Sequence, residues 1–341
     1  MGIVVVELAL RFLNSDDPWR STREANILRN FQYSYDIRHL YENDTPHVDY
    51  IRNQYGLRDG CKSPAEIEIL TIGGSTTDQR YVSLKSTYQN IIEKRMKMSS
   101  DAFGCVSNAG VDGHSTWGHL YSFENWFPLI PGLKPKIILL YVGVNDADFL
   151  RALSPNAFDT SRLQPVIKRF LKRFEIVWAL LPIYRLLSQQ YDNLSAAYAN
   201  HAPKRYTDDD YTVNVMNEQT ELLSNQNALA FRSRMEDLLS KIHSLGAIPL
   251  CVTQPHRFIK EKDGETWGVK NVLGEGFSGI DFDYSIQKLN VVIFDLCRSN
   301  TVDLYSHVFS NSHFYDAVHT TANGSEEIGS VIADFIISNF K

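Results

Sequence analysis

The sequence lacks the features of several common protein classes. It has only four cysteines in 341 residues, and acidic residues outnumber basic ones by 40 to 34. No Cys-x-x-Cys pair or Cys/His ligand spacing is present, which argues against a zinc site and against a dense disulfide framework. The formal charge of −6 offers no basic surface for nucleic acid. We therefore expect no structural metal and no nucleic-acid partner.

The four cysteines are far apart in the chain, at Cys61, Cys105, Cys251 and Cys297. We expect free thiols, because a framework of bridges is typical of small, cysteine-rich secreted domains. Cys105 and Cys251 fall inside apolar runs, where cysteine usually behaves as a small buried hydrophobe.

The chain also has no intact signal or anchor segment at its start. Residues 1–12 are apolar but far shorter than the roughly 20 residues that cross a bilayer. Two interpretations remain open from these residues: a strand or helix packed on the domain, or the end of a membrane anchor or signal segment, followed by Arg11.

What the chain does have is a regular alternation of predicted strands and helices from residue 66 onward. A hydrophobic content of 43% is enough for one large domain with a sizeable core. Helical stripes, such as Met235, Leu238, Leu239 and Ile242, separate the apolar runs. The predicted strands are Glu66 to Ile72, Phe103 to Ser107, Ile137 to Val142, Ala247 to Thr253 and Val302 to Leu304. This pattern predicts an α/β fold with a parallel sheet between layers of helices.

Two regions interrupt this alternation. Residues 1–65 form a predicted N-terminal segment that wraps the edge of the main domain, residues 66–341. Residues 150–215 form a mostly helical insertion in that domain. Its segment 164–187 is basic and then strongly apolar. A helix packed on the domain, a substrate lid and an amphipathic contact with a membrane surface all remain open for this segment.

Four short polar segments carry the chemistry, and two of them directly follow predicted strands. Because parallel strands deliver such residues to one sheet edge, the segments are expected to meet there. They are Gly73-Gly74-Ser75, Asn108-Ala109-Gly110-Val111-Asp112-Gly113, Gly143-Val144-Asn145-Asp146 and Asp316-Ala317-Val318-His319.

These segments contain the parts of a serine nucleophile site. An active serine needs a base within hydrogen-bond reach and a third group that orients the base. Ser75 is the candidate nucleophile, His319 the base and Asp316 the orienting carboxylate. Oxyanion donors are predicted from the Ser75 N–H, the Gly113 N–H and the Asn145 amide. Singly, such residues are more often turn glycines, helix caps or surface pairs, but together and in this order they indicate acyl transfer.

At this point the chain resembles the SGNH, or GDSL-type, hydrolase family, from about Glu66 to Phe340. The resemblance implies a flavodoxin-like three-layer α/β/α sandwich with a central parallel sheet. It also implies Ser75, Asp316 and His319 as the catalytic triad, with Gly113 and Asn145 as oxyanion donors, and no metal or organic cofactor. A competing α/β-hydrolase would need a Gly-x-Ser-x-Gly motif, which the chain lacks.

The chain departs from the commonest pattern of the family. Gly74 stands where many members have Asp, and Thr77 where many have Leu. In this it is similar to carbohydrate esterases and other polysaccharide-modifying members. Residues 2–11 and 53–58 also look like the region after an anchor in membrane-attached bacterial members. We therefore expect a membrane-attached, extracytoplasmic protein, with a soluble cytoplasmic one as the alternative.

The function expected is a serine esterase that removes a small acyl group, most often acetyl, from a carbohydrate. Acyl transfer to a sugar hydroxyl and lipid ester hydrolysis are alternatives, and a non-catalytic glycan-binding module is a third class. His114 and His256 are weighed as substrate contacts at the border of the pocket. Trp117 and Tyr81 are taken as packing residues.

Overall fold

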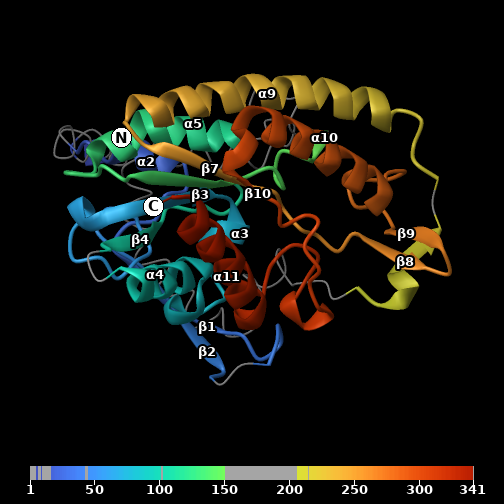
Figure 1. Ribbon diagram of the computed structural model, residues 1–341, viewed down its shortest axis with the longest axis horizontal. Coiled ribbons are helices and arrows are strands. Elements are labelled where there is room, and N and C mark those ends of the chain that lie inside the picture. Colours follow the sequence, from blue (N-terminus) through green and yellow to red (C-terminus); the bar gives the residue numbers. More distant parts are fainter. Residues whose placement is uncertain are drawn as a thin grey trace.

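The structure of the protein is a computed structural model, which describes residues 5–6, 9, 17–42, 45–100, 103–149, 206–213 and 215–340. Its centre is a sheet of five parallel strands in the order β10-β7-β5-β3-β4 (Figure 1). These strands are β3 (Ile67–Gly73), β4 (Cys105–Asn108), β5 (Ile137–Tyr141), β7 (Ile248–Val252) and β10 (Thr301–Val302). Each predicted strand is present, with ends within two residues of those expected.

Helices cover both faces of this sheet. In Figure 1, α5 (Thr116–Asn125), α9 (Thr220–Ser244) and α10 (Gly279–Cys297) lie on one side, and α4 (Tyr88–Ser99) and α11 (Ala322–Asn339) lie on the other. Numbered in chain order, the five strands run 2-1-3-4-5, which is the flavodoxin-like order. The predicted three-layer α/β/α sandwich is therefore confirmed.

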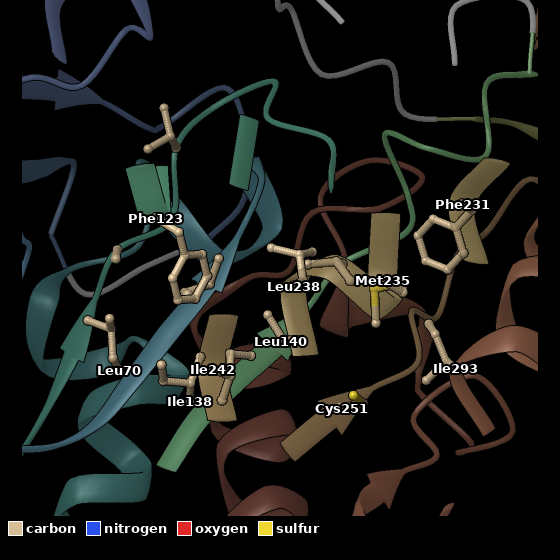
Figure 2. Close-up of a cluster of buried hydrophobic side chains, with 14 of the residues drawn as sticks. Leu70, Phe123, Ile138, Leu140, Phe231, Met235, Leu238, Ile242, Cys251 and Ile293 are labelled. Atoms are coloured by element: carbon tan, nitrogen blue, oxygen red, sulfur yellow. The ribbon is translucent and has the colours of Figure 1, made fainter. Parts of the chain in front are cut away.

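Strand β5 shows why the sheet is buried on both faces. Its alternate side chains Ile138 and Leu140 join the hydrophobic cluster under α5, α9 and α10 (Figure 2). Leu139 and Tyr141 join the cluster under α4 and α11. A strand that faces helices on both sides must be apolar at every position, which is why the run Ile137 to Val142 was recognisable in the sequence.

Two helices have ends with a clear local cause. The Thr87 side chain accepts a hydrogen bond from the Asn90 backbone N–H at the start of α4. Helix α9 ends before Gly246, which has a φ of +76°. A residue without a Cβ adopts this left-handed conformation at little cost, so the glycine terminates the helix.

Smaller elements surround the sandwich, and the sequence pattern did not predict them individually. A short helix α2 (Arg20–Glu24) precedes an antiparallel hairpin of β1 (Phe31–Asp36) and β2 (His47–Arg52). A second antiparallel sheet contains β6 (Tyr211–Val213), β8 (Ile259–Lys262) and β9 (Glu265–Val269). The remaining short helices are α3 (Ser75–Asp78), Pro64–Glu66, Leu84–Ser86, Phe127–Leu129, Asp208–Asp210, Arg298–Asn300 and Asn311–His313.

Most of the predicted insertion, residues 150–215, lies outside the described residues, and so does the whole of segment 164–187. The division at residue 65 stays a prediction. In the described part of the chain, no helix combines the length and the apolar character needed to cross a membrane.

The prediction of free thiols was wrong, because the four cysteines form two disulfides, Cys61–Cys105 and Cys251–Cys297. Arg58 forms an antiparallel bridge with Asn108, so the segment before β3 runs beside β4 and brings Cys61 opposite Cys105. Each pair is separated by more than 40 residues, 44 and 46 respectively. The pairing depends on tertiary structure, which spacing alone does not reveal.

Removing the second disulfide is expected to destabilise the fold. The double variant Cys251→Ala/Cys297→Ala removes a crosslink between residues that are 46 positions apart. Loss of such a disulfide typically lowers the free energy of unfolding by about 2–4 kcal/mol. Urea denaturation of the variant and the wild type measures the difference. A thiol titration of the unfolded, unreduced wild type is the control, and four reactive thiols there would contradict the assignment.

Candidate active site

The candidate nucleophile lies where the chain order of the strands reverses. Ser75 follows β3, and Asn145 follows the adjacent strand β5. In sheets of this order, ligands bind at the carboxyl ends of the strands beside the reversal. The two positions before Ser75 have no room for a side chain, which explains why both are glycine. A Cβ on Gly73 would lie 2.4 Å from the Tyr141 carbonyl, and one on Gly74 would lie 2.3 Å from Nδ2 of Asn145.

The structure brings Ser75, His319 and Asp316 together in one chain of hydrogen bonds. The Oγ of Ser75 lies 2.8 Å from Nε2 of His319. The other ring nitrogen, Nδ1, lies 2.7 Å from Oδ2 of Asp316. This arrangement fits a neutral imidazole that holds its proton on Nδ1 and accepts the serine proton on Nε2.

The Asp316 carboxylate is fixed by its own loop. Its Oδ1 accepts backbone N–H groups from Val318 at 2.9 Å and from His319 at 2.7 Å. The loop is closed by a hydrogen bond from the Tyr315 N–H to the His319 carbonyl, 3.1 Å, and the Arg257 N–H donates to the Ala317 carbonyl, 2.8 Å. The i, i+3 spacing of Asp316 and His319 thus belongs to a tight turn that leads into α11.

Burial and charge act in opposite directions on this pair. Burial by itself would raise the pKa of Asp316, but the neighbouring His319 and the N–H donors outweigh it and lower the pKa. Burial would likewise lower the pKa of His319, yet the Asp316 carboxylate raises it above the ordinary value of 6.5. The pair therefore favours an imidazolium beside a carboxylate, which is the charge state that forms after serine loses its proton.

The candidate oxyanion donors are the Asn145 amide and the backbone N–H groups of Gly113 and Ser75. Nδ2 of Asn145 donates to the His114 carbonyl at 2.9 Å, which orients the amide and leaves its second N–H for a ligand. Gly113 has a φ of +76°, and a Cβ there would meet nothing within 4 Å, so a substrate can approach its backbone. The Ser75 N–H is at the first position of α3, where an N–H has no partner within the helix.

The residue after Asn145 has a structural role. Asp146 is 1% exposed and accepts hydrogen bonds from the Thr116 N–H and hydroxyl at the start of α5. Arg234 of α9 lies 3.3 Å from the same carboxylate. Asp146 therefore anchors the loop that carries Asn145 to the start of α5.

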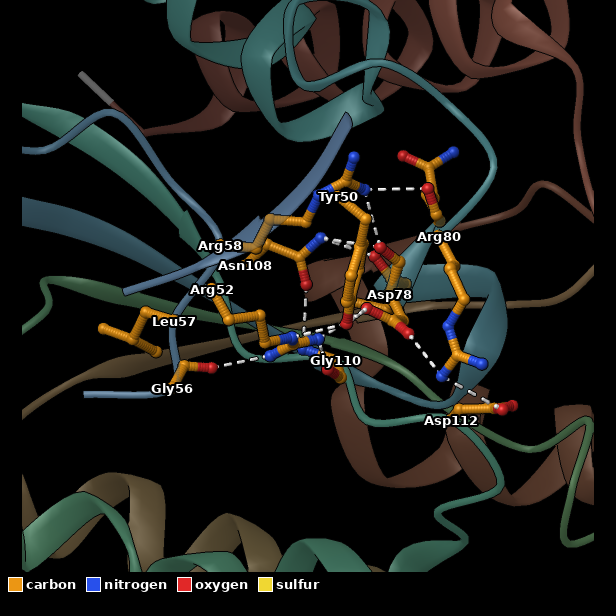
Figure 3. A network of polar contacts seen from close by, with 12 residues as sticks. Tyr50, Arg52, Gly56, Leu57, Arg58, Asp78, Arg80, Asn108, Gly110 and Asp112 are labelled. Atoms are coloured by element: carbon orange, nitrogen blue, oxygen red, sulfur yellow. Dashed lines mark hydrogen bonds and ion pairs between the residues drawn. The ribbon is translucent and has the colours of Figure 1, made fainter. Parts of the chain in front are cut away.

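Sequence reasoning missed a buried charge network that holds the nucleophile in place (Figure 3). Asp78, at the end of α3, pairs with Arg52 of β2, and the Tyr50 hydroxyl donates to it at 2.7 Å. Arg52 also donates to the Gly110 carbonyl in the candidate oxyanion loop. Arg80 then links Asp78, at 3.5 Å, to Asp112 of that loop, at 3.3 Å.

A second arginine from the N-terminal segment completes the support. Arg58 is 1% exposed and donates to the carbonyls of Asp78, 2.9 Å, and Gln79, 2.7 Å. Asn108 donates to the Thr77 carbonyl at 2.7 Å and accepts the Gly110 N–H at 2.8 Å. The nucleophile turn and the oxyanion loop are thus tied to one another and to the N-terminal segment.

His114 and His256 have buried partners instead of open space. Nε2 of His114 lies 2.7 Å from the Ala25 carbonyl, and burial lowers the pKa of this histidine to about 4. Nε2 of His256 lies 3.0 Å from Oδ1 of Asp283, which also accepts the Tyr305 hydroxyl at 2.7 Å. These contacts occupy one nitrogen of each ring and favour a structural role over contact with a substrate.

A cleft of about 1130 Å³ borders the Asp316 loop. Tyr41, Tyr315 and Asp316 form part of its wall, whereas Ser75 and His319 are not among its lining residues. The cleft therefore borders the turn that carries Asp316 without including Ser75 in its wall. In the described part of the chain, no group of His, Cys, Asp and Glu side chains is arranged to hold a metal ion.

No protein-family model matches the sequence, and no curated protein matches it. Solved structures with a similar arrangement include the lipase/acylhydrolase from Enterococcus faecalis, which is 14% identical with a TM-score of 0.44 over 81% of this chain and 98% of its own. An acetylxylan esterase from Geobacillus stearothermophilus is 13% identical, with a TM-score of 0.43 over 83% and 97%. A GDSL-like lipase from Bacteroides thetaiotaomicron is 11% identical, with a TM-score of 0.40 over 80% and 87%. At these values the likeness assigns no activity to this chain, whose own geometry must carry that argument.

Loss of the buried arginine is expected to destabilise the protein strongly. Arg52→Met leaves the buried Asp78 carboxylate without its nearest cation, which typically costs roughly 3–5 kcal/mol of unfolding free energy. Urea denaturation measures this loss. Lys136→Met is the matched control, because Lys136 pairs with Glu68 at 3.0 Å on the surface, where such a pair contributes about 0–1 kcal/mol. Equal losses in the two variants would show that the buried pair has no special role.

Proposed function

We propose that the protein is a serine esterase of the SGNH type that works through an acyl-enzyme on Ser75. The observation that carries the proposal is the unbroken chain from Oγ of Ser75 to Nε2 of His319, 2.8 Å, and from Nδ1 to Asp316, 2.7 Å. The nearby Asn145 amide and Gly113 N–H supply the donors that such a reaction requires.

The reaction follows from this geometry. Ser75 attacks the ester carbonyl while its proton passes to Nε2 of His319, and the oxyanion accepts hydrogen bonds from Ser75, Gly113 and Asn145. The C–O bond to the leaving group then breaks, and His319 returns the proton to the departing alkoxide. Water repeats the sequence on the acyl-enzyme, which releases the acid and restores Ser75.

A small acyl group, in particular acetyl, on a carbohydrate is the proposed substrate. The support is the resemblance of Gly73-Gly74-Ser75-Thr76-Thr77 to carbohydrate esterases.

We further propose that the protein works outside the cytoplasm, attached to a membrane through an N-terminal segment. Two disulfides support an oxidising compartment, since cytosolic proteins rarely keep such bonds.

The first test is the hydrolysis of p-nitrophenyl esters from acetyl to long acyl chains by the wild type and by Ser75→Ala. The wild type is expected to prefer the acetyl ester, and the variant is expected to lose activity by about 10⁴-fold or more, because no other group takes over the attack. Undiminished turnover in Ser75→Ala would remove the basis of the proposal. Adding an acetyl-accepting sugar and analysing products distinguishes hydrolysis from transfer.

The pH dependence tests the base. Only a neutral imidazole accepts the serine proton, so kcat/KM should rise with pH through an apparent pKa above 6.5, the direction in which Asp316 shifts His319. Asp316→Asn should lower that pKa, because burial is then opposed by the weaker field of Asp112 alone, and should reduce kcat by roughly 10³–10⁴-fold. A profile that is the same in both enzymes would exclude His319 and Asp316 as the working pair.

A further inference from the structure

An aromatic stack lies against the candidate base. The ring of Tyr315 lies parallel to that of His319, with ring centroids 5.6 Å apart and 7° between the planes. Tyr41 in turn stacks on Tyr315, at 5.7 Å and 12°. Tyr81 meets Tyr315 edge-on, at 6.2 Å and 78°. The base of the site is therefore one member of a packed set of rings, and two of the others come from outside its own loop.

The loop fixes the relation between the two stacked rings. Phe314 and Thr320 form an antiparallel bridge, and the Tyr315 N–H donates to the His319 carbonyl, so the two residues are opposite one another in a closed turn. Tyr315 is 6% exposed. The Tyr41 hydroxyl donates to the Tyr81 carbonyl at 2.7 Å, which holds the outer ring. The Tyr315 ring therefore has little room to move away from the His319 imidazole.

We propose that Tyr315 is a positioning residue for the reaction: its ring face fixes the plane of the His319 imidazole and stabilises the imidazolium that forms when Ser75 gives up its proton. The inference rests on the proposed esterase function. An aromatic face carries the negative part of the ring quadrupole, and a cation over that face is attracted to it. The attraction is absent while the imidazole is neutral, so it favours the charged state of the reaction over the resting state.

The charged groups around His319 come from three loops. Asp316, from its own turn, and Asp112, from the loop after β4, both raise the pKa of His319, and Arg80, after α3, lowers it. Tyr315 adds no charge, because burial raises the pKa of its hydroxyl well above 10. Any effect of its ring on the base must therefore come from the π face and from packing.

Two substitutions separate the ring face from the hydroxyl. Tyr315→Phe keeps the aromatic face. Its kcat should therefore stay within about twofold of the wild-type value, and the acidic limb of its pH profile should stay within about 0.2 pH units. Tyr315→Leu removes the face, so kcat should fall about tenfold, with little change in KM, and the limb should move to lower pH by about half a unit or more. Tyr35→Leu is the matched control, because the Tyr35 ring packs edge-on against Tyr81, at 5.1 Å, and not on the imidazole.

A shape-preserving series covers the case in which the leucine variant does not fold. Phenylalanine carrying one, two, three or five ring fluorines at position 315 keeps the packing but progressively weakens the negative face. The measured quantity is the pH dependence of Ser75 labelling by a fluorophosphonate, which needs the same base and no knowledge of the natural substrate. The apparent pKa should fall stepwise along the series.

The outcomes distinguish this inference from the function on which it rests. If the wild type is not labelled at Ser75, the proposed function fails. If the wild type is labelled but the fluorinated series keeps one pKa, or if Tyr35→Leu loses as much activity as Tyr315→Leu, the role of Tyr315 is overturned while the esterase proposal stands.

Discussion

The geometry of the candidate site depends on the buried ion pair between Arg52 and Asp78. Both side chains are 2% exposed, and the pair joins three parts of the chain: the β1-β2 hairpin, the nucleophile turn and the oxyanion loop. A buried carboxylate stays charged only when cations and donors surround it, and here these lower the pKa of Asp78 in spite of burial. The N-terminal segment is thus part of the machinery that holds Ser75, and more than a cover for the domain edge.

The elements that the sequence predicted well are those with a local physical signature. Strands such as Ile137–Tyr141 are apolar at every position because helices cover both of their faces. Ser75 and Asn145 were recognisable because they follow such strands, and His319 because Asp316 precedes it by three residues. Arg52, Arg58 and the two disulfides were not predicted, because their partners are distant in sequence and no periodicity marks them.

The glycine at position 74 has a steric explanation. A Cβ there would lie 2.3 Å from Nδ2 of Asn145, far inside contact distance. The amide itself donates to the His114 carbonyl, whose oxygen lies 3.1 Å from the same Cβ position. A larger residue at 74 would need a different position of Asn145, so the glycine and the amide donor are coupled. The sequence shows the glycine at position 74, but the reason for it becomes visible only when the loop that carries Asn145 is seen beside it.

Two sets of supporting contacts meet at the hydrogen bond between Ser75 and His319. The nucleophile is held by Arg52 and Arg58, whereas the turn of the base is held through Arg257, whose N–H donates to the Ala317 carbonyl. Arg257 lies in the segment after β7, the strand that the second disulfide fastens to α10. A shift of about 1 Å in either turn would disturb the contact between Ser75 and His319. A misplacement of this size in a working active site can lower the rate about 10²-fold. Rigidity on both sides is therefore a requirement of the chemistry, and it explains why so much buried charge surrounds one serine.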